Sequence, residues 1–114
     1  MTTNVTPAVL CAATQITNAA ATYITGAAAS QTIIKRAVFN NITAGAVTIT
    51  VYRVASGGSA GTTNEVISAR PVSAGATDLA PELANMVLNA GDTIQAKASA
   101  NTSVNMTASG FISS

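Results

Sequence analysis

Residues 46–54, which read AVTITVYRV, decide the fold. Apolar and hydroxyl-bearing side chains alternate along this stretch with a period of two, which is the spacing of a β-strand and not of a helix. One face of the predicted strand carries Val47, Ile49, Val51 and Arg53. Because Arg53 interrupts an apolar face, we expect it at the end of the strand, near water or an acidic partner.

Similar segments recur along the chain at short intervals, separated by Gly, Asn, Ser and Pro. β-branched residues and Thr dominate them, which favours strands over helices. The other predicted strands are residues 8–16, 21–25, 32–40, 64–69, 77–80, 93–98 and 104–112. About seven or eight strands at this spacing are typical of a single all-β sandwich with jelly-roll or Greek-key connections.

The domain organisation follows from the length. A chain of 114 residues has no room for a second full-sized core. We expect the β-sandwich domain to occupy residues 19–114, and residues 1–18 to be either an N-terminal extension or the first strand. Pro81 and Glu82 suit the start of a helix, so one helical turn is expected within residues 81–88.

Charge and composition exclude several classes of function. Only 8% of the residues are charged, against about 25% in an ordinary soluble domain. Five basic and four acidic residues give no positive excess for binding nucleic acid. The chain has no His and one Cys, which excludes His-based catalytic triads, zinc sites built on His or paired Cys, and a disulfide framework. We therefore expect no catalytic, cofactor-binding or metal-binding residues and no small-molecule substrate.

The apolar content predicts a thin core. Apolar residues make up 48% of the chain, but nearly half of them are alanine. So few large side chains are a weak basis for independent stability, and we expect the chain to be a homo-oligomer. Cys11 is expected to be a small core residue. Asp92 follows Gly91 at a predicted turn, where its carboxylate can accept backbone N–H bonds.

No segment of the sequence is a candidate for a membrane span or an export signal. Residues 1–34 carry no charged side chain, but Thr, Asn and Gln interrupt every window long enough to cross a bilayer. The short apolar piece at residues 7–13 lacks the preceding Lys or Arg of a signal peptide. We expect no membrane partner and synthesis in a cytoplasm.

Two short segments are the candidates for protein contact. Lys35 and Arg36 form the only run of charges, and neighbouring strand residues point to opposite faces, so one of them should face inward or toward a neighbour. Protection of a sheet edge and a salt bridge to an acidic subunit are both open interpretations. Gly57, Gly58 and Ser59 lie in a flexible loop without the Lys and helix of a phosphate-binding loop, so the loop is either plain surface or a contact ordered by a partner.

Five segments also carry a likeness to a known group of proteins. They are TIIKR at 32–36, VTITVYRV at 47–54, SGGSA at 56–60, PEL at 81–83 and VLNAGDTIQAKA at 87–98. In this order they resemble small virion-associated proteins encoded by tailed bacteriophages. The resemblance covers about residues 20–112 and brings no active-site motif with it.

The resemblance implies a non-enzymatic, all-β structural protein, made in the host cytoplasm without a signal peptide and located in the virion. The first interpretation is a capsid decoration (cement) protein, bound to the major capsid protein or to other virion proteins. The alternative is a neck, tail or fibre-attachment component, and a bacterial adhesin or binding module is the second alternative. Low charge with abundant Ala, Thr, Ser and Asn suits close, repeated protein contacts.

Overall fold

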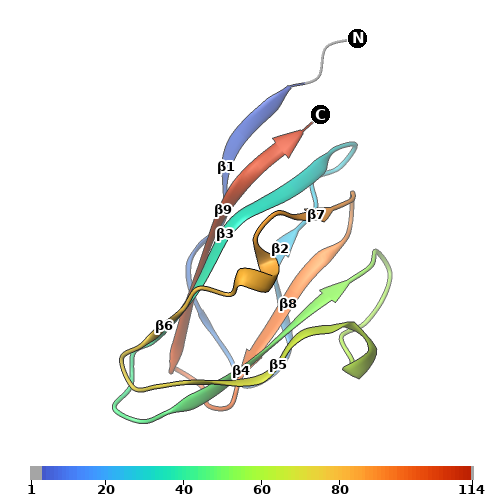
Figure 1. The fold of residues 1–114 in the computed structure, drawn as a ribbon. Helices are drawn as coiled ribbons and strands as arrows, with labels where there is room; N and C mark the ends of the chain where they lie inside the picture. The colour runs from blue at the N-terminus through green and yellow to red at the C-terminus, as the bar shows by residue number, and fades with distance from the viewer. Residues whose placement is uncertain (1–3, 114) are drawn as a thin grey trace.

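The structure, a computed structural model, describes residues 4–113 and consists of two antiparallel sheets packed face to face (Figure 1). Sheet A has the order β1-β9-β3-β6, with β7 also paired to β3, and sheet B has the order β2-β8-β4-β5. The strands are β1 (Val5–Ile16), β2 (Ala21–Thr25), β3 (Gln31–Asn41), β4 (Val47–Val54), β5 (Glu65–Val72), β6 (Thr77–Asp78), β7 (Met86–Leu88), β8 (Thr93–Ala98) and β9 (Val104–Ser113). The predicted all-β sandwich is confirmed. Residues 1–3 of the predicted N-terminal segment lie outside the described residues.

The strands pair in a nested pattern. β1 pairs with β9, β2 with β8, β3 with β6 and β7, and β4 with β5, all antiparallel. This is the pattern of one long hairpin rolled up on itself, in which β6 and β7 together occupy the place of one strand. Of the two connection types that the sequence left open, the structure has the jelly roll.

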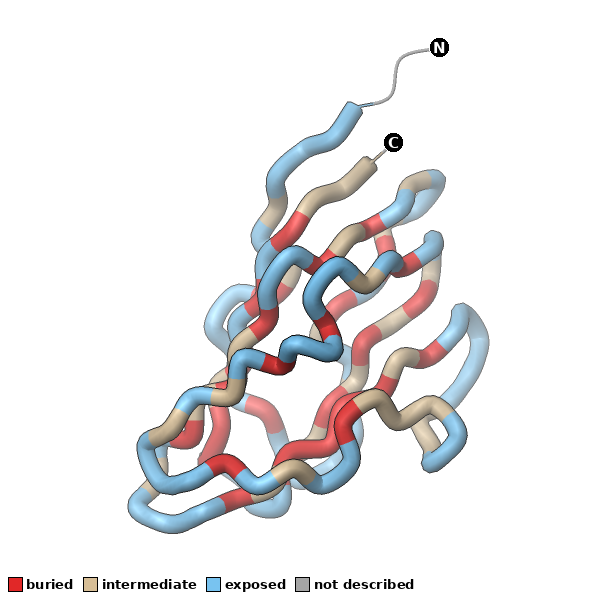
Figure 2. The backbone as a smooth tube through the Cα atoms, viewed as in Figure 1, coloured by how far each residue is buried: buried red, intermediate tan, exposed pale blue. Residues whose placement is uncertain are grey.

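The core lies between the two sheets. Val47, Ile49 and Val51 of β4 are at most 7% exposed and belong to this core. Thr50, Tyr52 and Val54 on the opposite face of β4 are also buried, so exposure does not alternate along this strand. Figure 2 shows buried positions recurring along the central strands. Fully buried side chains from both sheets and from the turn at Pro81–Leu83 meet there: Ile16, Ile24, Ile34, Phe39, Leu83, Leu88, Ile94, Val104 and Met106. Cys11 is 6% exposed and belongs to this cluster, which confirms its predicted place in the core.

The segment at residues 81–88 differs from the prediction. A 3₁₀ turn covers only Pro81–Leu83, and Asn85 then has a φ of +65°. Met86–Leu88 continue as β7, with Val87 opposite Ile33 of β3. The one helical turn predicted within residues 81–88 is thus this 3₁₀ turn, whereas the strand after it was not predicted, because pairing with a distant strand outweighs the local helix signal.

One side of the sandwich is closed by Arg70. This residue lies on β5, the edge strand of sheet B, and it donates to Asp78 of β6 at 3.3 Å and to Glu82. β6 is at the edge of sheet A, so the guanidinium joins the edges of both sheets. Pro71 follows on β5, where an edge strand tolerates its missing N–H.

Candidate protein-contact surface

An apolar row crosses the outer face of sheet A. Pro7 of β1 lies opposite Phe111 of β9, and Ile33 of β3 lies opposite both Phe111 and Val87 of β7. Residues opposite one another in an antiparallel sheet share a face. The next residue along β3, Ile34, is fully buried in the core. The row therefore points away from the core.

The exposed valines of the chain gather around this row. Val9 is 72% exposed, Val5 58% and Val87 42%. We call Val5, Pro7, Val9, Ile33, Val87 and Phe111 the tip surface, because they lie at the end of the sandwich where β1 begins and β9 ends (Figure 1). A hollow of about 400 Å³ opens here, lined by Pro7, Ala8, Val9, Lys35, Ser109, Gly110 and Phe111. Contiguous exposed apolar side chains of this kind mark interaction sites.

A β-bulge places both residues of the predicted charge run beside this hollow. The register between β3 and β9 shifts between Ile34 and Arg36, so that Arg36 lies opposite Ser109 and Lys35 has no opposite residue. Lys35 and Arg36 are both exposed, whereas Ile34 and Ala37 on either side of them are buried. The expectation that the two cations point to opposite faces is wrong, because the extra residue of a bulge breaks the alternation.

Gly110 on the neighbouring strand allows this bulge. A Cβ atom at Gly110 would lie 1.9 Å from the carbonyl oxygen of Ile33 and 2.9 Å from the backbone nitrogen of Lys35. Only a residue without a side chain permits such a close approach of β9 to β3. Sequence reasoning missed this role because the signal is a glycine far along the chain from the bulge it supports.

The outer face of sheet A carries positive charge without a matching carboxylate. Among residues 4–113, the ion pairs are those of Arg53 with Asp92 and of Arg70 with Asp78 and Glu82. Within that part of the chain, Lys35, Arg36 and Lys97 have no carboxylate partner. Lys35 and Arg36 are therefore available for an acidic group from outside the chain.

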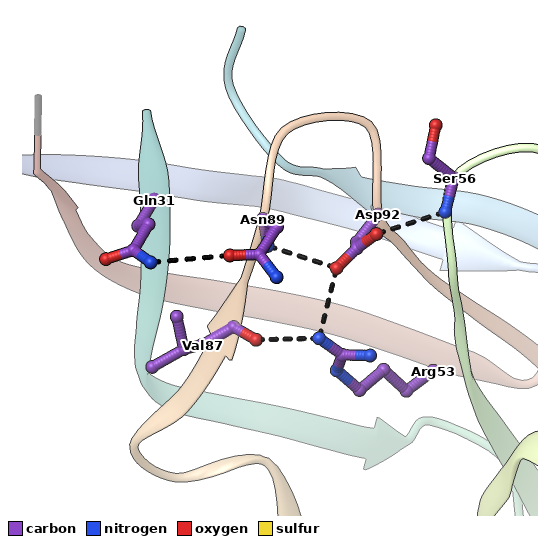
Figure 3. A network of polar contacts seen from close by, with 6 residues as sticks. All are labelled: Gln31, Arg53, Ser56, Val87, Asn89 and Asp92. Atoms are coloured by element: carbon purple, nitrogen blue, oxygen red, sulfur yellow. Dashed lines mark hydrogen bonds and ion pairs between the residues drawn. The ribbon is translucent and has the colours of Figure 1, made fainter. Parts of the chain in front are cut away.

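The turn before β8 is organised by Asp92 (Figure 3). Its Oδ1 accepts the backbone N–H of Ser56 at 3.0 Å, and its Oδ2 accepts the backbone N–H of Asn89 and the Nη2 of Arg53, both at 3.1 Å. These bonds, first that of Ser56, hold the pKa of Asp92 below its ordinary value, against burial, which raises it. The predicted role of Asp92 as an acceptor of backbone N–H bonds is confirmed.

Arg53 links this turn to the tip surface. It lies near the end of β4 with its side chain 32% exposed and paired to Asp92, which confirms the place predicted for it. The same guanidinium donates to the carbonyl oxygen of Val87 at 3.0 Å. The Arg53–Asp92 ion pair therefore supports the strand that presents Val87.

The predicted contact loop lies apart from the cationic pair. Gly57, Gly58 and Ser59 are exposed in the connection from β4 to β5, and Gly57 has a φ of +82°. This connection leaves sheet B, whereas Lys35 and Arg36 lie on sheet A. The structure does not bring the two groups of predicted contact residues together into one site.

Across residues 4–113, no cluster of His, Cys, Asp or Glu could hold a metal ion, and no helix has the length and hydropathy to cross a membrane. Every buried side-chain nitrogen or oxygen of those residues has a hydrogen-bond partner.

Comparison with known proteins gives a structural match but no match by sequence. No protein-family model matches the chain, and no curated protein matches it. A chain in the structure of infectious bursal disease virus, Gx strain, is similar to it, with a TM-score of 0.49 and 18% sequence identity. The match covers 98% of this chain and 31% of the viral chain, so this protein spans about a third of that chain's length.

Proposed function

We propose that the protein is a non-enzymatic structural component of a bacteriophage virion, in which neighbouring proteins cover the β1 edge and the tip surface. The observation that carries this proposal is a long, uncharged sheet edge next to an exposed apolar row. The virion is proposed from the sequence resemblance, and the contact surface from the geometry.

The β1 edge differs from the other sheet edges. β1 is twelve residues long, has no charged side chain and is largely exposed (Figure 2). The other edges are short or protected: β2 has five residues, β7 has three, β6 has two, and β5 carries Arg70 and Pro71. Proteins that stay monomeric usually block long edges with charge. An edge left without charge supports pairing with a neighbour.

The backbone of β1 is not regular enough to pair with an added strand along its whole length. Pro7 lacks an N–H donor, and the register of β1 with β9 shifts between Val9 and Cys11 and again between Cys11 and Thr14. These interruptions limit how many backbone bonds an added strand could form. The exposed valines beside the edge therefore supply part of the contact through apolar burial.

Within the virion we favour a capsid decoration protein bound to the major capsid protein. A single small domain of 11.3 kDa without a chemical site fits a role in which many copies add weak contacts. A neck, tail or fibre-attachment component is the alternative. Cryo-electron microscopy of intact particles tests both, with on the order of hundreds of copies expected on the head. Roughly a dozen copies or fewer, or density on the tail, would favour the alternative, and absence from particles would exclude both.

A surface variant tests the contact itself. Val9→Lys should leave folding unchanged, because Val9 is 72% exposed, but should prevent binding to particles that lack the protein. Ile42→Lys is the matched control, since Ile42 is 52% exposed and lies outside the tip surface. Normal binding of the Val9 variant would show that the tip surface is not the contact.

A further inference from the structure

We propose that the hollow beside Lys35 receives a segment of another virion protein that carries a carboxylate among apolar side chains. This inference rests on the proposed function and names the chemistry of the partner. It combines three observations: the lining of the hollow, the bulge at Lys35, and the places of the chain's own carboxylates.

The lining of the hollow requires an occupant of mixed character. Pro7, Val9 and Phe111 favour apolar side chains, and Lys35 is the only charged residue in the lining. An apolar group seated there would displace water from the ammonium group of Lys35. Loss of hydration around an unpaired charge is costly unless an opposite charge replaces the water. A carboxylate on the occupant provides that replacement.

The bulge brings a second positive charge to the same side as the hollow. A single lysine could turn its ammonium group toward water at the rim of an interface. Here Arg36 lies on the same side as Lys35, so two cations stand where a regular strand would present one. The guanidinium of Arg36 can also bind a carboxylate through two parallel hydrogen bonds.

The acidic side chains of a second copy, all within residues 4–113, do not supply the missing charge. Asp78, Glu82 and Asp92 already pair with arginines of their own chain. Glu65 is only partly exposed, lies on β5 of the other sheet and accepts a bond from Ser68. Two copies joined symmetrically through the hollow would place Lys35 and Arg36 against the same cations. Charge complementarity therefore points to a different protein.

Reversal of single charges tests this inference. Particles produced without the protein are incubated with purified wild type, Lys35→Glu or Lys97→Glu, and the bound copies are counted. Lys97 is the matched control, because it also lacks an ion pair within residues 4–113 but lies on β8 of sheet B. We expect Lys35→Glu to lower the affinity about tenfold or more, and Lys97→Glu to bind like wild type. Equal melting temperatures of the three proteins establish that each is folded.

Four results would overturn the inference. Lys35→Glu could bind like wild type, or both variants could lose the same affinity, which would indicate a general effect of charge. Light scattering could show that the isolated chain self-associates through the hollow, with both Val9→Lys and Lys35→Glu yielding monomers, which would make a second copy the occupant. Failure of the wild type to bind particles would contradict the proposed function, and this inference with it. Loss confined to Lys35→Glu supports both.

Discussion

At the scale of single residues, Asp92 connects three parts of the chain: its own turn, the segment that begins at Ser56, and Arg53 of β4. Asp92→Asn should lower the midpoint of urea unfolding at pH 7, because an amide brings no charge to Arg53 and presents an N–H₂ group toward backbone donors. Glu65→Gln is the control, since Glu65 has no ion pair, and should retain the wild-type midpoint. Equal effects of the two substitutions would contradict the role of Asp92.

The same carboxylate predicts a pH dependence. The pKa of Asp92 in the folded chain lies below its ordinary value of 3.8, so the folded state favours the ionised form of this side chain. Its stabilising contribution is fully present above that ordinary value and is lost as the pH falls through the lower folded pKa. The difference in urea midpoint between wild type and Asp92→Asn should therefore narrow below pH 3.8. Unfolding curves from about pH 6 to about pH 2 measure it, and a constant difference would refute this account.

Gly110 makes a second prediction at this scale. Gly110→Ala forces a methyl group against the backbone of β3 and should lower the free energy of unfolding by about 1 to 3 kcal/mol. Gly45→Ala is the matched control, because no atom lies within 4 Å of a Cβ placed there. Urea unfolding of both variants gives the comparison. Similar free energies of unfolding for the two variants would mean that β3 and β9 can move apart at residue 110 without loss of stability.

At the scale of elements, β1 and β4 should differ most in local stability. β4 lies between β8 and β5 with most of its residues buried, whereas β1 pairs only with β9 and is mostly exposed. Amides of β1 in the isolated chain should exchange with solvent roughly tenfold or more faster than those of β4. Hydrogen exchange measured by mass spectrometry tests this. Equal protection of the two strands would show that the β1 edge is already covered in solution.

The elements also show how far the sequence predicts the structure. The bounds of β2 and β8 match the predicted strands, and β4 differs by one residue, because alternation and turn residues are local signals. β7 was missed because its extended form depends on pairing with Ile33, far away in the chain. The bulge at Lys35 was missed for the same reason, since it depends on Gly110. Around the hollow the sequence singled out only Lys35 and Arg36, and it missed the tip surface, because that surface forms only where β1, β3, β7 and β9 come together.

At the scale of the whole molecule, the thin core predicts dependence on neighbours. Alanine supplies nearly half of the apolar residues, and the long axis of 52 Å against 26 and 19 Å leaves much surface for each buried side chain. We expect the isolated chain to be oligomeric or to melt at a low temperature. Light scattering combined with thermal unfolding measures both. A monomer melting above about 70 °C would contradict this expectation.

The burial of Cys11 has a practical consequence. It is the only cysteine of the chain, it lies on β1, and burial raises the pKa of its thiol, so reagents meet little thiolate while β1 is in place. The rate at which this thiol is labelled therefore measures how often β1 separates from the rest of the sandwich. If Cys11 is labelled quickly in the free protein and slowly in the assembled one, a neighbouring protein keeps β1 in place in the assembly.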